Sequence, residues 1–141
     1  MESLIQLPVN EKVFELSVKG ETSLQLFKGK FKCVCIPNLQ QRSEASVLEK
    51  QLNRDLATLD AETSAFHRMI AQLSVRLLAA PDWWIASSGG KTLLDLNVVF
   101  ELWKSCMQAE KDWKDLVWKD EKKPEEKKEL ESTSEADPAK E

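Results

Sequence analysis

A long apolar segment near the middle of the chain decides the fold: residues 60–81 read DAETSAFHRMIAQLSVRLLAAP. Apolar side chains fall almost all round a helix built from this segment, and a helix with so little polar surface is usually the central one of its fold. We predict that it runs from Ala61 to Ala80, capped by Asp60, and that Pro81 ends it, because the residue before a proline disfavours the helical conformation. Its polar positions fall mainly on one narrow line: Asp60, Ser64, Arg68, Gln72 and Arg76.

The sequence before this segment alternates between apolar and polar residues, as half-buried strands do. The first such stretch is Lys12–Val18, and Lys19–Thr22 is a plausible turn. Alternation resumes over Leu24–Ile36 but changes phase near Gly29, which favours a bulge or a second short turn there. We therefore predict a β-hairpin or three-stranded meander within residues 1–37, which must pack on helices to be stable.

Two further helices are predicted around the central one. The first begins at Asn38, with Gln41 as its capping-box partner, and carries an apolar stripe from Ala45 to Leu59. After a loop through residues 81–90, Asp95 is expected to cap a last helix from Leu96 to about Lys119. The predicted class is α+β: a small antiparallel β unit (1–37) packed on a body of about three helices (38–119), followed by a disordered charged tail (120–141).

Composition favours a soluble protein that does not bind nucleic acid. The chain has 141 residues, of which 42% are hydrophobic and 31% are charged, enough for one modest core. The net charge is −4, and residues 121–141 hold eight acids and five lysines, so the rest is nearly neutral. A neutral body has no surface for a phosphate backbone. No signal peptide or membrane span is apparent, and three cysteines are an odd number for a disulfide framework, so we expect an intracellular protein.

No motif predicts catalysis, a metal site or a cofactor site. Residues 89–92 (GGKT) match the end of a phosphate-binding loop, but Ile85 stands where the first glycine is needed and no strand precedes it. His67 has no nucleophile beside it that the sequence would place there, so a packed or rim histidine is expected. Zinc would need Cys33, Cys35, Cys106 and His67 together, and buried apolar cysteine is the simpler interpretation. We expect a protein that is not an enzyme.

The tryptophans are the unusual feature, because all five lie between Trp83 and Trp118. One of the pair at 83 and 84 is expected to fill the core at the loop corner, as is Trp103 against the central helix. The segment from residue 110 to 123 is mostly charged, so its apolar residues either bind a partner helix or fold back on the body. The candidate protein-binding residues are Trp83, Trp84, Trp113, Leu116, Val117 and Trp118.

The order of these features resembles a known family. A β unit opens the chain, residues 80–84 read APDWW, and after a Gly-Gly turn residues 94–99 read LDLNVV and begin a charged helix with a Lys/Glu tail. Over residues 11–120 this is similar to the tail assembly chaperones of long-tailed bacteriophages. The most specific elements are the Pro-Asp-Trp-Trp corner and the Leu-Asp-x-Asn-Val helix start.

The resemblance implies a non-enzymatic role in the cytoplasm of an infected bacterium. Such chaperones bind the long helical tape measure protein, keep it soluble and help recruit tail tube subunits. For this chain we expect neither nucleic acid nor a membrane as a partner. The family has no catalytic residues to carry over to this chain. Two other roles are compatible with the sequence: a structural virion component, such as a head–tail connector or minor tail protein, and a small regulatory protein that binds a host factor. The near-heptad stripe of the last helix also permits self-association.

Overall fold

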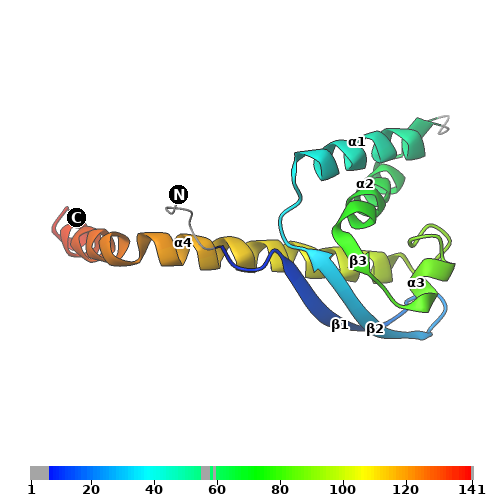
Figure 1. The fold of residues 1–141 in the computed structure, drawn as a ribbon, viewed down its shortest axis with the longest axis horizontal. Coiled ribbons are helices and arrows are strands. Elements are labelled where there is room, and N and C mark those ends of the chain that lie inside the picture. The colour runs from blue at the N-terminus through cyan, green and yellow to red at the C-terminus, as the bar shows by residue number, and fades with distance from the viewer. Residues whose placement is uncertain (1–6, 55–57, 59, 141) are drawn as a thin grey trace.

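The computed structural model describes residues 7–54, 58 and 60–140, with side chains described as far as Lys119. Within these residues a three-stranded antiparallel sheet, a pair of helices and one long helix make up the fold (Figure 1). The long helix α4 lies against the sheet and extends well beyond it, and the helix pair stands beside the third strand. The predicted α+β class, with a small N-terminal sheet on a mainly helical body, is confirmed.

The N-terminal strands β1 (Glu11–Lys19) and β2 (Leu26–Val34) form a hairpin. Their register pairs Phe14 with Phe31, whose rings stack at 5.7 Å between centroids. The predicted bulge or turn at Gly29 is wrong, because β2 passes straight through this residue opposite Leu16. The apparent change of phase arises because Leu24 and Leu26 are exposed instead of lying on the buried face.

The helix pair consists of α1 (Leu39–Arg54) and α2 (Ala61–Arg76), which pack against each other. Both predicted N-caps are confirmed. The Gln41 amide N–H donates to the side chain of Asn38, whose own N–H donates back to Gln41 Oε1, and this completes a capping box. Asp60 accepts hydrogen bonds from the N–H and hydroxyl of Thr63. The end of the predicted stripe, at Leu56 and Leu59, lies outside the described residues.

The central helix ends four residues earlier than predicted. Leu77 is already extended, and the chain runs without a linker into strand β3 (Leu77–Ala79). This strand pairs antiparallel with β2, so the sheet order is β1-β2-β3 and the third strand does not come from the N-terminal third. Strand β3 pairs with the free edge of β2 and satisfies backbone N–H and C=O groups of β2 that would stay unpaired if β3 were helical. This tertiary contact overrides the helical pattern of the sequence.

The chain then turns through a short helix into the long one. The predicted loop after Pro81 contains helix α3 (Asp82–Ala86), and a turn leads to α4 (Leu96–Lys140). α4 begins where predicted but its backbone continues past Lys119. The prediction of a disordered tail falls on residues 120–141, whose side chains lie outside the described part, and it stays a prediction.

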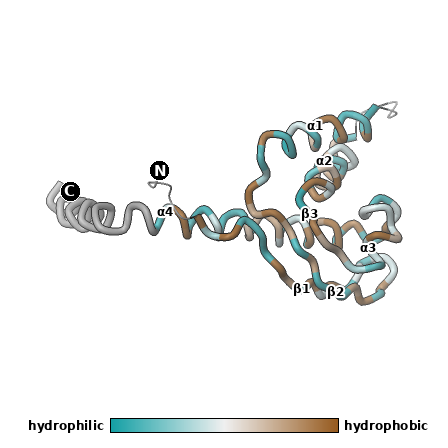
Figure 2. The backbone as a smooth tube through the Cα atoms, in the orientation of Figure 1, coloured by the Kyte–Doolittle hydropathy of each residue, from teal (hydrophilic) through white to brown (hydrophobic). Residues whose placement is uncertain are grey.

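One hydrophobic core joins the sheet, α2, α3 and the first half of α4. Figure 2 shows hydrophobic backbone segments gathered where these elements meet. Phe31, Leu73 and Leu102 are the largest of the side chains that are almost completely inaccessible to water. These three side chains come from β2, α2 and α4, so the core lies where these elements meet. Its other buried members are Leu16, Phe27, Cys33, Cys35, Ile70, Trp84, Val98, Val99, Cys106 and Ala109.

Asp95 holds the hairpin turn onto the start of α4. Its carboxylate accepts hydrogen bonds from the N–H groups of Thr22 and Ser23 and from the Ser23 hydroxyl. Asn97 reinforces the contact by donating to the Lys19 carbonyl. Gly20 lies so close that a Cβ there would collide with the carboxylate. Asp95 does stand directly before α4, and its backbone carbonyl accepts from the Val98 N–H. Its side chain does not cap the helix, because both carboxylate oxygens accept hydrogen bonds from the turn.

Replacing Asp95 by asparagine is expected to lower the melting temperature and to flatten its dependence on pH in acid. The Ser23 hydroxyl and the N–H groups of Ser23 and Thr22 hold the pKa of Asp95 below its usual value. Stability from this carboxylate is therefore full above the unfolded-state pKa, near 3.9, and is lost as the pH falls through the lower folded-state pKa. Thermal melts between about pH 2 and 6 would measure this.

A matched control for this change is Asp82→Asn, because Asp82 is exposed and its side chain makes no hydrogen bond to the described residues. If Asp95→Asn and Asp82→Asn melt alike across this pH range, the hairpin clamp does not stabilise the fold.

A buried ion pair joins α2 to α4 beside the sheet. Arg76 is 5% exposed and its Nη2 lies 2.7 Å from Glu110 Oε1, while its Nη1 donates to the Cys35 carbonyl. Lys114 also contacts Glu110, at 3.0 Å. The pair gives the last member of the central helix's polar line a buried partner on α4.

Candidate protein-binding surface

The two tryptophans at the loop corner pack into the hydrophobic core. Trp84 is 5% exposed and packs edge-on against Phe31 and Trp83. Trp83 is half-buried, lies 5.0 Å from the Phe27 ring, and donates its indole N–H to the Lys28 carbonyl. The Pro-Asp-Trp-Trp corner thus seals the hairpin onto the body.

Close packing around this corner explains two glycines. A Cβ at Gly29 would collide with the Pro81 ring, so the corner requires glycine in β2. Gly90 has a φ of 91°, a conformation that favours glycine. A Cβ there would collide with the Trp84 ring and with the Cδ1 methyl group of Ile70.

The four candidates on α4 divide between the body and the surface. Trp113 folds back: its indole N–H donates to the Pro8 carbonyl and its ring packs on the core. Val117 is half-buried, whereas Leu116 and Trp118 are 54% and 62% exposed. These residues lie where α4 leaves the body, far along the helix from the tryptophan corner (Figure 1). The structure therefore does not bring the predicted residues into one site.

A different surface gathers apolar side chains around a hollow, which we call the first hollow. It lies where α2 meets β3, opposite α3 and the turn after it, and has a volume of about 390 Å³. Leu78 and Ile85 at its border are 48% and 64% exposed, so apolar groups reach solvent there. Its lining is Leu48, Ile70, Leu73, Ser74, Leu77, Leu78, Ala79, Ala80, Trp84, Ile85, Ser88, Gly89 and Lys91.

A second hollow adjoins the first on the side of α4. It has a volume of about 320 Å³, and both hollows share Ile70 and Lys91 in their walls. Apolar residues dominate it as well, although Glu62 and His67 stand at its border. We call the two hollows together the groove. The remaining lining of the second hollow is Leu52, Thr63, Phe66, Gly90, Leu96 and Val99.

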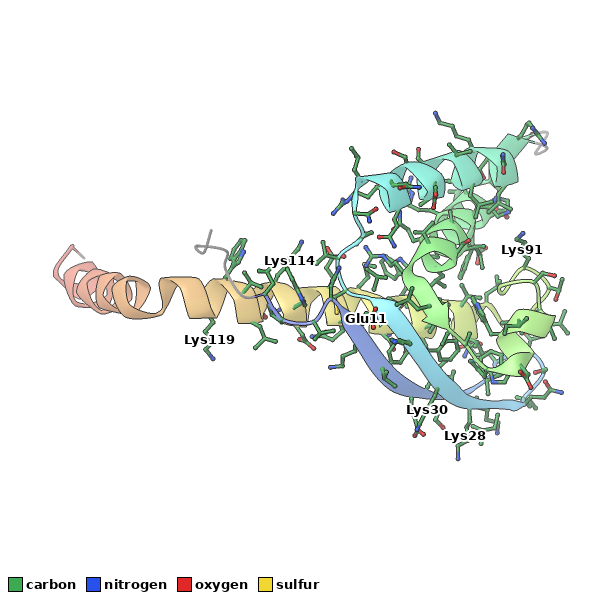
Figure 3. All side chains as sticks on the ribbon, in the orientation of Figure 1. Glu11, Lys28, Lys30, Lys91, Lys114 and Lys119 are labelled. Atoms are coloured by element: carbon green, nitrogen blue, oxygen red, sulfur yellow. The ribbon has the colours of Figure 1, made fainter. Side chains whose placement is uncertain are left out.

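The turn after α3 places Lys91 between the two hollows. Ser87 fixes this turn, because its hydroxyl donates to the Trp84 carbonyl and accepts from the Gly90 N–H. Gly89 and Gly90 both have positive φ, which lets the chain reverse. Lys91 then projects toward the α1–α2 side, whereas Lys28 and Lys30 project from β2 on the opposite side (Figure 3). The Gly-Gly-Lys motif is thus part of a turn with α3 before it, and the strand of a phosphate-binding loop is missing.

The other polar candidates lie apart from one another. His67 is half-buried and its Nδ1 lies 2.8 Å from Asn53 Oδ1, which joins α2 to α1. The three cysteines are free and buried, as predicted. A hydrogen bond to Cys33 and burial raise the pKa of Cys106, and burial raises the pKa of Cys35, so these two thiols stay protonated as small core groups. The part of the chain that the structure describes holds no group of three or more potential metal ligands.

The chain matches no protein-family model, no curated protein and no solved structure. Among the described residues, no helix carries an apolar stretch long enough to cross a bilayer.

The sequence did contain one signal for the groove. The central segment has apolar residues almost all round, and Phe66, Met69 and Val75 among them are only half-buried in the structure. The predicted central helix continues to Ala80. The switch to β3 at Leu77 instead turns Leu78 outward and opens the first hollow.

Proposed function

We propose that this protein is a tail assembly chaperone of a long-tailed bacteriophage, which binds apolar helices of the tape measure protein in the host cytoplasm. The observation that carries the proposal is the groove, two adjoining apolar hollows that open to solvent beside α2. A helix offers apolar side chains at regular spacing along one face, and grooves of this kind accept such faces. The resemblance in residues 11–120 supplies the identity of the partner.

The exposed apolar residues of α4 support the same role. Leu116 and Trp118 are more than half exposed on a helix that projects away from the body. Tryptophan and leucine on a projecting helix offer a further apolar contact to a long client. A tape measure protein held in this way would stay soluble until tail tube subunits replace the chaperone.

Co-expression with the tape measure protein encoded in the same genome tests the proposal. We expect the soluble fraction of the tape measure protein to rise several-fold, and the two proteins to co-purify. A tape measure protein that is equally insoluble with and without this chain, and does not co-purify with it, would contradict the proposal. Detection of this chain in purified virions by mass spectrometry would instead favour a structural component.

A further inference from the structure

Lys91 is the only lysine or arginine among the described residues that line the groove, and its position suggests what kind of helix the groove accepts. Lys91 is exposed and is the only charged residue among the described residues that line the first hollow. It makes no ion pair with any residue whose side chain the structure describes. We propose that the groove binds a partner helix through two apolar anchors, one in each hollow, and that Lys91 pairs with an acidic side chain of that helix.

The shape of the groove sets the spacing of the anchors. Ile70 lines both hollows, Phe66 lines only the second and Leu73 only the first, so the hollows follow one another along α2. Residues on one face of a helix recur at three, four and seven positions, which correspond to about 5–11 Å along its axis. Apolar side chains one or two turns apart on one face therefore fit the two hollows, and Leu78 and Ile85 cover the first anchor from the side.

The charges around Lys91 determine over which hollow the acidic side chain of the partner helix can lie. Glu62 borders the second hollow, and an acidic side chain placed there would be repelled. The first hollow has only serine hydroxyls beside Lys91, from Ser74 and Ser88. An acid on the partner is therefore best placed over the first hollow. This inference rests on the proposed function for the identity of the partner, but not for the chemistry of the contact.

A pair of designed peptides tests the site directly. Both form an amphipathic helix with leucines seven residues apart, and they differ only by Glu or Lys at one position flanking the leucine stripe. We expect the Glu peptide to perturb the amide NMR signals of Leu78, Ile85 and Lys91 in the full chain, and to bind about threefold more tightly than its Lys twin.

Charge reversal at Lys91 gives the decisive comparison. Lys91→Glu is expected to weaken the Glu peptide about threefold and to reverse the preference in favour of the Lys twin. Lys28→Glu is the matched control, because Lys28 is also exposed but lies on the opposite side of the molecule. Ile85→Ser is expected to weaken both peptides, and its melting temperature should match that of the wild type because Ile85 is 64% exposed.

The outcomes separate this site from the proposed function. Perturbed signals elsewhere, no binding of either peptide, or equal effects of Lys91→Glu and Lys28→Glu would overturn the site. Fragments of the tape measure protein that bind wild type and Lys91→Glu equally would also overturn the site but leave the proposed function standing. Peptides that bind in the groove while no tape measure fragment binds would leave the site standing and overturn the function.

Discussion

Replacing Trp84 by alanine is expected to lower the free energy of unfolding by about 3–5 kcal/mol, as large aromatic truncations in a packed core do. Trp84 is 5% exposed, and its ring lies between Phe31, Trp83 and the close turn at Gly90. Removing the ring leaves a cavity that this turn cannot fill, because Gly90 contributes no side chain. Chemical denaturation followed by circular dichroism would measure the loss.

Leu116→Ala is the matched control for this truncation. Leu116 is also a large apolar candidate of the sequence prediction, but it is 54% exposed on α4. Its substitution is expected to change the free energy of unfolding by less than about 0.5 kcal/mol. Similar losses for Trp84→Ala and Leu116→Ala would mean that the tryptophan corner does not fill the core as described here.

Replacing Arg76 by methionine is expected to destabilise the fold by about 3 kcal/mol, because it leaves a mostly buried carboxylate without its main partner. Burial raises the pKa of Glu110, but hydrogen bonds from Arg76 and Lys114 outweigh it and hold the pKa below its usual value. Lys114 is itself about half exposed and cannot replace the short Arg76 contact. The Cys35 carbonyl also loses its donor.

A second substitution separates the ion pair from simple packing. The double variant Arg76→Met/Glu110→Leu removes both charges and is expected to recover most of the lost free energy, since a buried pair is often replaceable by apolar groups. Denaturation of the two single variants and the double variant completes the thermodynamic cycle. Additive losses in this cycle would show that the two side chains do not interact.

The wild-type pair should also make stability depend on pH. The folded-state pKa of Glu110 is lowered, so its contribution is full above the unfolded-state pKa and disappears as the pH falls through the folded value.

Local signals in the sequence predicted the elements well, and long-range contacts account for what they missed. Asn38 with Gln41, and Asp60, begin helices as expected, because a cap is decided by residues three positions apart. Asp95 likewise stands just before a predicted helix, but its carboxylate accepts hydrogen bonds from a turn more than seventy residues earlier in the chain. Nothing within a short window of sequence distinguishes these two uses of an aspartate.

The same limit applies to the candidate site. Tryptophan abundance pointed to positions 83, 84 and 113 as binding residues. All three pack in or against the core, as aromatic residues often do, and Trp84 also lines the first hollow. The groove depends on Leu77 leaving the helix to pair with β2, which requires the hairpin to be in place. Lys91 is part of the groove only because Gly90 packs on Trp84. α2, β3 and the turn come together only in the folded structure, so no single stretch of sequence could predict the groove.

The direct passage from α2 into β3 has a mechanical consequence. Arg76 ends the helix and Leu77 begins the strand, so no flexible residue separates them. Tilting α2 to widen the groove must pull on the three-residue strand, and the β2–β3 hydrogen bonds resist that movement. The width of the groove is thereby governed by the sheet. A client that forces it wider would first loosen β3, and faster amide hydrogen exchange at residues 77–79 would report that strain.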